Sequence, residues 1–277
     1  AAPAAGASAP LAGAASVPAS TAPAVASIGA SAVPGTPAPA APAAREKIEV
    51  TTDVYRLTFD GEGGSLTHAE LLKHADMTDK AKNFVLFDES TQRVYVAQTG
   101  LIGGSFPTHK TVMTAVPGPR ALKDGENELT IRFESPEQGG VKLVKTWTLK
   151  RGAYDIAVKH EVVNVGSTAV SPQLYLQLVR DGNKPPGESS FYSTFTGPAV
   201  YTDAKKYQKI EFKDIENGKV DIPKESPNGY VAMVQHYFAS AWLLADGVQR
   251  ELFTRKVSDN LYSVGMITPL GNIDPGT

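Results

Sequence analysis

Five histidines are the residues of this sequence most suited to metal binding or acid–base chemistry: His68, His74, His109, His160 and His236. No two are four residues apart, the spacing that places two zinc ligands on one face of a helix, and no carboxylate pattern accompanies them. His160 lies on the apolar side of a predicted strand, where a hydrogen-bonded histidine is more common than a metal ligand. The sequence therefore predicts no metal site.

The other common catalytic patterns give no anchor for an active site. The chain has no cysteine, which excludes disulfides, thiolate metal sites and cysteine nucleophiles, and it has no Gly-x-Ser-x-Gly motif. Gly61–Gly64 lacks the spacing of a dinucleotide-binding loop and is interpreted as a turn or bulge. The carboxylate pairs Glu126/Glu128 and Glu134/Glu137 lie in turn-like segments that are typical of solvated surface. We expect neither a cofactor nor an enzymatic activity.

One segment has the composition of a contact surface. Residues 201–212 read YTDAKKYQKIEF and combine three lysines with three aromatic residues: Tyr201, Lys205, Lys206, Tyr207, Lys209 and Phe212. Tyrosine supplies contact area and lysine supplies electrostatic steering, so these six residues are the predicted partner contact. The alternative is a solvated edge strand whose lysines prevent aggregation.

The candidate side chains described above are expected to lie on short strands or in the turns between them, because the apolar residues of the chain alternate with period two. Leu129, Ile131 and Phe133 share one face of a predicted strand, as do the leucines at 174, 176 and 178. Residues 154–162 place five side chains on one side of a half-buried strand: Tyr154, Ile156, Val158, His160 and Val162. Residues 66–74 fit a helix or a strand.

Turn signals separate these strands. Six Asp-Gly or Asn-Gly pairs favour the positive φ angles of tight turns: Asp60-Gly61, Asp124-Gly125, Asp181-Gly182, Asn217-Gly218, Asn228-Gly229 and Asp246-Gly247. Leu143, Lys145, Trp147 and Leu149 share a further strand face, and we expect Lys145 at an edge or rim. Many short strands with turns between them predict an all-β sandwich.

Composition divides the chain into two parts. Residues 1–44 contain no charged residue, 20 alanines and 8 prolines, so we expect residues 1–45 to form a disordered Ala/Pro-rich tether. Residues 46–277 are predicted to form one globular domain. They carry 26 Lys and Arg against 29 Asp and Glu, interspersed, which argues against a nucleic-acid surface. No apolar run approaches the roughly 20 residues that cross a bilayer.

Five segments resemble a known family. They are Thr51–Leu72, Tyr95–Leu101, Lys145–Asn164 (KTWTLKRGAYDIAVKHEVVN), Phe195–Ile215 and Gly229–Leu244. In this order they resemble the large periplasmic domain of the YidC family of membrane-protein insertases, known mainly from Gram-negative bacteria. The resemblance spans nearly all of residues 46–277.

The resemblance implies a β-supersandwich of two large antiparallel sheets with little helix, similar to the sugar-binding fold of galactose mutarotases. It implies a periplasmic location between a membrane anchor and a five-helix insertase core, and a family domain that continues past Thr277 by a strand and a helix. Insertion chemistry belongs to that core, so no insertase residue is carried over.

The implied function is a non-catalytic, monomeric module. It would scaffold or contact Sec translocon subunits, chaperones or nascent membrane proteins during their insertion and folding in the inner membrane. The alternative is a carbohydrate-binding or mutarotase-like periplasmic protein, which requires carboxylates that converge with His160 or His236.

Overall fold

A nine-stranded antiparallel sheet forms one layer of the domain. The computed structural model describes residues 45–185, 187 and 194–277, so the predicted tether lies outside the described residues except for Arg45. The strand order across the sheet is β1 (Lys47–Thr51), β2 (Tyr55–Asp60), β3 (Ser65–Ala75), β4 (Asn83–Glu89), β5 (Val94–Ile102), β10 (Gln173–Asp181), β17 (Leu261–Pro269), β16 (Arg250–Ser258) and β13 (Glu225–Ser226). Residues 66–74, which the pattern left open between helix and strand, lie in β3.

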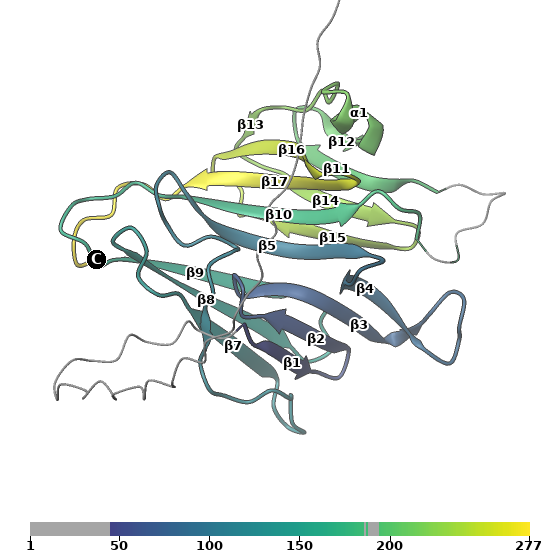
Figure 1. Cartoon of the computed structure of the whole chain (residues 1–277). Coiled ribbons are helices and arrows are strands. Elements are labelled where there is room, and N and C mark those ends of the chain that lie inside the picture. The colour runs from purple at the N-terminus through teal and green to yellow at the C-terminus, as the bar shows by residue number, and fades with distance from the viewer. Residues whose placement is uncertain (1–44, 186, 188–193) are drawn as a thin grey trace, which may run out of the picture. The chain divides into compact units, whose positions relative to one another are not determined.

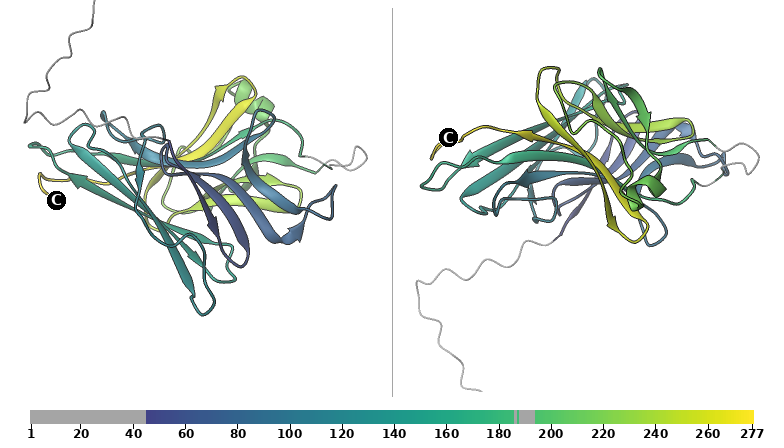
Figure 2. Two further views of the ribbon diagram at one scale, coloured as in Figure 1. Left: turned by 60° about the horizontal axis from the view of Figure 1, so that its bottom comes forward. Right: turned by 90° about the horizontal axis from the view of Figure 1, so that it is seen from above.

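Two four-stranded sheets form the second layer (Figure 1). One has the order β12 (Lys206–Lys209), β11 (Thr196–Thr202), β14 (Tyr230–Gln235) and β15 (Phe238–Leu243). The other has the order β6 (Thr114–Ala115), β7 (Glu128–Glu134), β8 (Val141–Lys150) and β9 (Ile156–Asn164). In the left view of Figure 2 they form separate groups of ribbons, teal for β7–β9 and light green for β14 and β15.

Strand β5 shows that both small sheets cover the same face of the large one. Tyr95 and Thr99 are four residues apart on this regular strand, so their side chains point to the same side. The Tyr95 hydroxyl lies 3.2 Å from the Met233 carbonyl of β14, and Thr99 Oγ1 lies 2.8 Å from His160 Nε2 of β9. The all-β supersandwich prediction is confirmed, with the second layer divided into two sheets.

The core lies between these layers and follows the period-two pattern. In β7 the side chains alternate strictly between exposed and buried, and Leu129, Ile131 and Phe133 are the buried ones. In β10 the leucines at 174, 176 and 178 are buried as predicted. The described residues contain one helix, α1 (Phe212–Glu216), which is far too short to cross a membrane.

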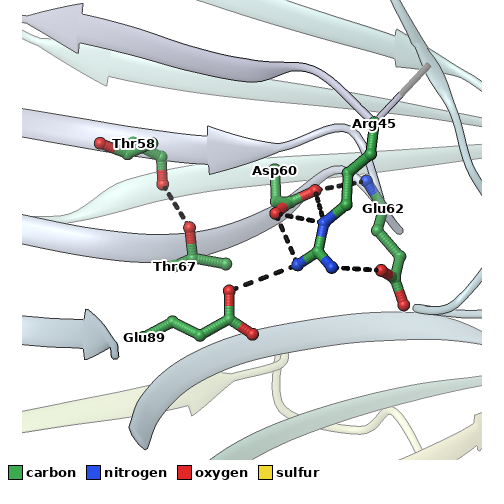
Figure 3. Close-up of polar contacts among 6 residues, drawn as sticks. All are labelled: Arg45, Thr58, Asp60, Glu62, Thr67 and Glu89. Carbon is green, nitrogen blue, oxygen red and sulfur yellow. Dashed lines mark hydrogen bonds and ion pairs between the residues drawn. The ribbon is translucent and has the colours of Figure 1, made fainter. Parts of the chain in front are cut away.

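An ion-pair cluster attaches the beginning of the described chain to β2 (Figure 3). The Arg45 guanidinium lies 2.8 Å from Asp60, 3.0 Å from Glu62 and 3.5 Å from Glu89. The Asp60 side chain is fully buried, whereas that of Arg45 is half exposed. Arg45, the last residue of the segment predicted as a tether, is thus bound to the folded domain.

Candidate functional site

A row of three tyrosines crosses the outer face of the sheet that contains β11, β12 and β14. Tyr201 of β11 lies directly opposite Tyr207 of β12 on one side and Tyr230 of β14 on the other. The Tyr201 and Tyr230 rings stack with centroids 5.4 Å apart and planes inclined by 10°. The row points outward because the neighbouring residues Val200 and Val231 are fully buried in the core. Cross-strand register therefore assembles an aromatic surface.

The outermost ring of this row is accessible to a partner. Tyr207 lies on the edge strand β12 and is 46 % exposed. Partial burial, and then the nearby Tyr230, raise the pKa of Tyr207, so its hydroxyl is neutral at physiological pH. A neutral phenol offers apolar contact area together with a hydrogen-bonding tip.

The three predicted lysines surround this surface in different ways. Lys205 forms a 2.8 Å ion pair with Asp221, and Lys206 adopts a positive φ of 58° at the end of the β11–β12 turn. Lys209 shares the face of Tyr207 and places its ammonium 5.3 Å from the Phe195 ring centroid. All three are exposed. Since β12 is also an edge strand, the alternative explanation of these lysines as protection against aggregation fits the same geometry.

The structure gathers only part of the predicted set on one face. Tyr201, Tyr207 and Lys209 share the outer face, whereas the half-buried Phe212 begins α1 and packs against Tyr262 with ring centroids 4.7 Å apart. Tyr230 belongs to the surface but was absent from the prediction. The predicted turn at Asn228-Gly229 directly precedes Tyr230, but nothing local showed that the strand beginning at Tyr230 pairs with β11.

A buried polar cluster pins the small sheet of β8 and β9 to the large sheet. Lys145 is fully buried, and its ammonium donates hydrogen bonds of 2.6 Å to the carbonyls of Gly63 and Thr99. Burial lowers the pKa of Lys145 to about 7. The expectation that Lys145 lies at an edge or rim is wrong, because β8 is an inner strand and backbone acceptors from the opposite layer receive the side chain.

The two histidines of the carbohydrate alternative, His160 and His236, have hydroxyl partners. His160 lies 2.8 Å from the Thr99 hydroxyl, and burial followed by the charge of Lys145 lowers its pKa to about 3. His236 Nδ1 lies 3.0 Å from the Thr194 hydroxyl. Within the described part of the chain no three His, Asp or Glu side chains are grouped as metal ligands. The contacts of His160 and His236 thus differ from the carboxylate partners that the carbohydrate alternative requires.

The fold of this domain is a β-supersandwich of the galactose-mutarotase type. A galactose mutarotase related enzyme from Lactobacillus acidophilus superposes with a TM-score of 0.51, covering 84% of this chain and 94% of that one. The two sequences are 9% identical, so the likeness shows the fold alone.

The particular family follows from sequence. The family model of the YidC periplasmic domain matches residues 47–277, and the chain belongs to this family. The membrane protein insertase YidC of Janthinobacterium sp. (strain Marseille) is 50% identical over 242 residues, which are 87% of this chain and 43% of that protein. That of Dechloromonas aromatica is 46% identical over 272 residues, 98% of this chain and 48% of that protein. The chain thus spans less than half the length of these relatives. The predicted family and its periplasmic location are confirmed.

Proposed function

We propose that this domain is a non-catalytic contact module of a membrane-protein insertase in the inner membrane. In this role it scaffolds the insertion machinery by binding Sec translocon subunits, periplasmic chaperones or nascent membrane proteins. The family assignment supports the setting, and the relatives are named as insertases. The contact itself is assigned to the surface formed by Tyr201, Tyr207, Tyr230 and the neighbouring lysines.

The tyrosine row is the observation that supports this assignment. Two of its rings are already stacked, so binding a partner costs little side-chain entropy. Tyr207 extends the row to the sheet edge and is 46 % exposed. Interfaces are enriched in tyrosine because its rigid ring supplies a large contact area. Lys206 and Lys209 add positive charge beside the rings, which favours a partner with an acidic patch.

Site-specific photocrosslinking tests this assignment in the full-length protein in its membrane. A photoreactive phenylalanine analogue replaces Tyr207, and crosslinked products are identified by mass spectrometry. Tyr154 is the matched control, since it is an equally exposed tyrosine (42 %, against 46 % for Tyr207) in the β8–β9 connection. We expect position 207 to capture a membrane-protein partner or a chaperone and position 154 to capture much less.

Charge reversal gives a second readout. Lys205→Glu combined with Lys206→Glu is expected to reduce the crosslink at position 207, more strongly at low salt because exposed charges act over about one Debye length, ~10 Å at 0.1 M. The control variant Lys80→Glu with Lys82→Glu also reverses two exposed lysines on a turn, one of them paired with Asp79. Equal crosslinking at 207 and 154, or equal effects of the two double variants, would show that this surface is not the contact.

A further inference from the structure

Two of the eight asparagines of this chain, Asn217 and Asn228, directly precede a glycine. In such a pair the backbone nitrogen of the glycine can attack the side-chain amide of the asparagine, because glycine has no Cβ to hinder the approach and rotates freely about its backbone bonds. The attack succeeds only where the surrounding structure lets the two groups meet. The two pairs differ in this respect.

The Asn217-Gly218 pair ends helix α1 in a Schellman motif. Asn217 is the C-cap, with φ −88° and ψ 0°, and Gly218 follows with a positive φ of 62°. The Gly218 N–H donates a 3.2 Å hydrogen bond to the Ile215 carbonyl, and the Lys219 N–H donates a 2.8 Å hydrogen bond to the Asp214 carbonyl. Two terminal backbone hydrogen bonds thus hold the pair.

This end of α1 is exposed and lightly held. Asn217 and Gly218 are both exposed, and a Cβ added at Gly218 would meet no atom within 4 Å. Within the described part of the chain, the side chain of Asn217 makes no hydrogen bond. Helix α1 has only five residues, so few contacts are lost when its last turn opens. The Gly218 nitrogen therefore reaches the Asn217 amide by a local opening.

The Asn228-Gly229 pair is fixed by its neighbours. The side-chain oxygen of Asn228 accepts a 2.9 Å hydrogen bond from the Asp203 N–H. Gly229 lies so close to β11 that an added Cβ would overlap the Tyr201 carbonyl. The Gly229 carbonyl accepts a 2.8 Å hydrogen bond from the almost fully buried Arg250. Attack at Asn228 requires these contacts to open together.

We propose that Asn217 is a site of spontaneous deamidation and that the fold protects Asn228 from the same reaction. The Gly218 backbone nitrogen attacks Cγ of Asn217 and gives up its proton, and the side-chain nitrogen leaves as ammonia. The product is a cyclic succinimide. Water then opens the ring at either carbonyl, which yields aspartate, or isoaspartate with the main chain running through Cβ. Water is the only co-reactant, and nothing is oxidised or reduced.

Both products alter the end of α1. Each adds a negative charge beside the last carbonyls of the helix, where the helix dipole disfavours it. Isoaspartate also lengthens the main chain by one carbon, which displaces the N–H groups of Gly218 and Lys219 from their acceptors. Glu216 of the same turn lies 2.8 Å from the Tyr262 hydroxyl and 3.1 Å from the Lys256 ammonium. We therefore expect deamidation to loosen α1 from the β16–β17 hairpin.

Peptide mapping of the complete 277-residue chain tests the proposal. The folded protein is aged in mildly alkaline buffer made with heavy-oxygen water, and then digested with trypsin in ordinary water at mildly acidic pH. Trypsin releases Asn217 in residues 214–219 and Asn228 in residues 225–250, so one mass spectrum measures both sites. Heavy oxygen in the product marks deamidation of the protein before digestion. We expect Asn217 to react at least about tenfold faster than Asn228, because the local opening around Asn217 breaks fewer contacts.

Two controls separate the effect of the fold from that of the sequence. In the chain unfolded with guanidinium chloride the contacts that distinguish the two pairs are absent, so the two rates should agree within about threefold. The variant Asn217→Gln keeps the amide but lengthens the side chain, which disfavours ring closure. We expect it to abolish the product in residues 214–219 and to leave the rate at Asn228 unchanged.

Hydrogen exchange of residues 212–216 in fresh and aged protein measures the effect on α1. We expect faster exchange in the aged protein, in proportion to the deamidated fraction, and equal exchange in fresh and aged Asn217→Gln. Unchanged exchange in the deamidated wild-type protein would refute the expected loosening of α1.

Three results would overturn the assignment of the site. They are equal rates at the two asparagines of the folded chain, a faster reaction at Asn228, and a rate at Asn217 that folding lowers by more than about a hundredfold, since α1 would then protect its own end. The reaction involves no residue of the tyrosine row. Its outcome is therefore independent of the crosslinking test at Tyr207.

Discussion

The buried Lys145 should make the stability of this domain rise with pH above neutrality. Its ammonium has no access to solvent, no carboxylate among the described residues pairs with it, and two carbonyls accept its hydrogen bonds at 2.6 Å. Burial penalises the charged form and lowers the pKa of Lys145 from 10.5 to about 7. Between these two values the unfolded chain binds more protons than the folded chain. The free energy of unfolding therefore increases as the pH rises through this range.

The size of the effect follows from the two pKa values of Lys145. A full displacement from 10.5 to about 7 corresponds to roughly 5 kcal/mol. Between pH 7 and pH 9 the free energy of unfolding should rise by about 2 kcal/mol, at most ~1.4 kcal/mol per pH unit. Other buried groups titrate outside this window. The pKa of His109 is lowered to about 4 and that of His160 to about 3, whereas the pKa of Tyr95 is raised to about 12.

Urea unfolding at pH 7, 8 and 9 measures this slope. Trp147 and Trp242 are the only two tryptophans, and both rings lie inside the domain, so intrinsic fluorescence reports global unfolding. The variant Lys145→Met keeps the length of the side chain and removes its charge, so the slope should vanish. Lys142→Met is the matched control, because Lys142 lies on the same strand and is exposed.

Two outcomes would refute this reasoning about Lys145. One is a wild-type stability that changes by less than about 0.5 kcal/mol between pH 7 and pH 9, since the linkage relation then assigns no proton uptake to unfolding. The other is an undiminished slope in Lys145→Met, which would assign the titration to another group.

Three further substitutions are expected to lower stability in the same urea assay. Arg250 is almost fully buried and donates hydrogen bonds to five backbone carbonyls between residues 227 and 248. Arg250→Ala should therefore lower the free energy of unfolding by about 3 kcal/mol, and Arg250→Lys should restore only part of this loss. Gly229 has a φ of +92°, and an added Cβ would overlap a carbonyl oxygen of β11. Gly229→Ala should therefore lower the free energy of unfolding by about 2 kcal/mol or more. The control Gly118→Ala should be near neutral, because the space around Gly118 is open. Arg45→Ala leaves the buried Asp60 carboxylate without its cation and should cost about 1–2 kcal/mol; no loss would mean that the half-exposed Arg45 contributes only a solvated contact.

Local sequence patterns were sufficient for the class of fold and for the family. Period-two alternation placed β7, β10 and most of β9 correctly, because the side of a strand on which a residue lies depends only on its neighbours in the chain. The placement of Tyr154 was wrong, since it lies in the connection before β9 and is 42 % exposed. Turn chemistry was less informative. Of the six Asp-Gly or Asn-Gly pairs only Asp60-Gly61 (β2–β3) and Asp124-Gly125 (β6–β7) lie between strands that pair with each other. The tight β14–β15 turn is formed by His236-Tyr237 instead. Surrounding strand pairing decided which turns became hairpins.

Only the tertiary structure decided the environment of Lys145 and the composition of the tyrosine row. The two carbonyls that bind Lys145 lie 82 and 46 residues away in sequence, so no local pattern could distinguish a buried lysine from one at a rim. Tyr230 joined Tyr201 and Phe212 left the predicted surface for the same reason, since register between distant strands sets both positions. A sequence determines which side of each strand is apolar, but long-range pairing determines which side chains of distant strands meet on one surface or in one buried cluster.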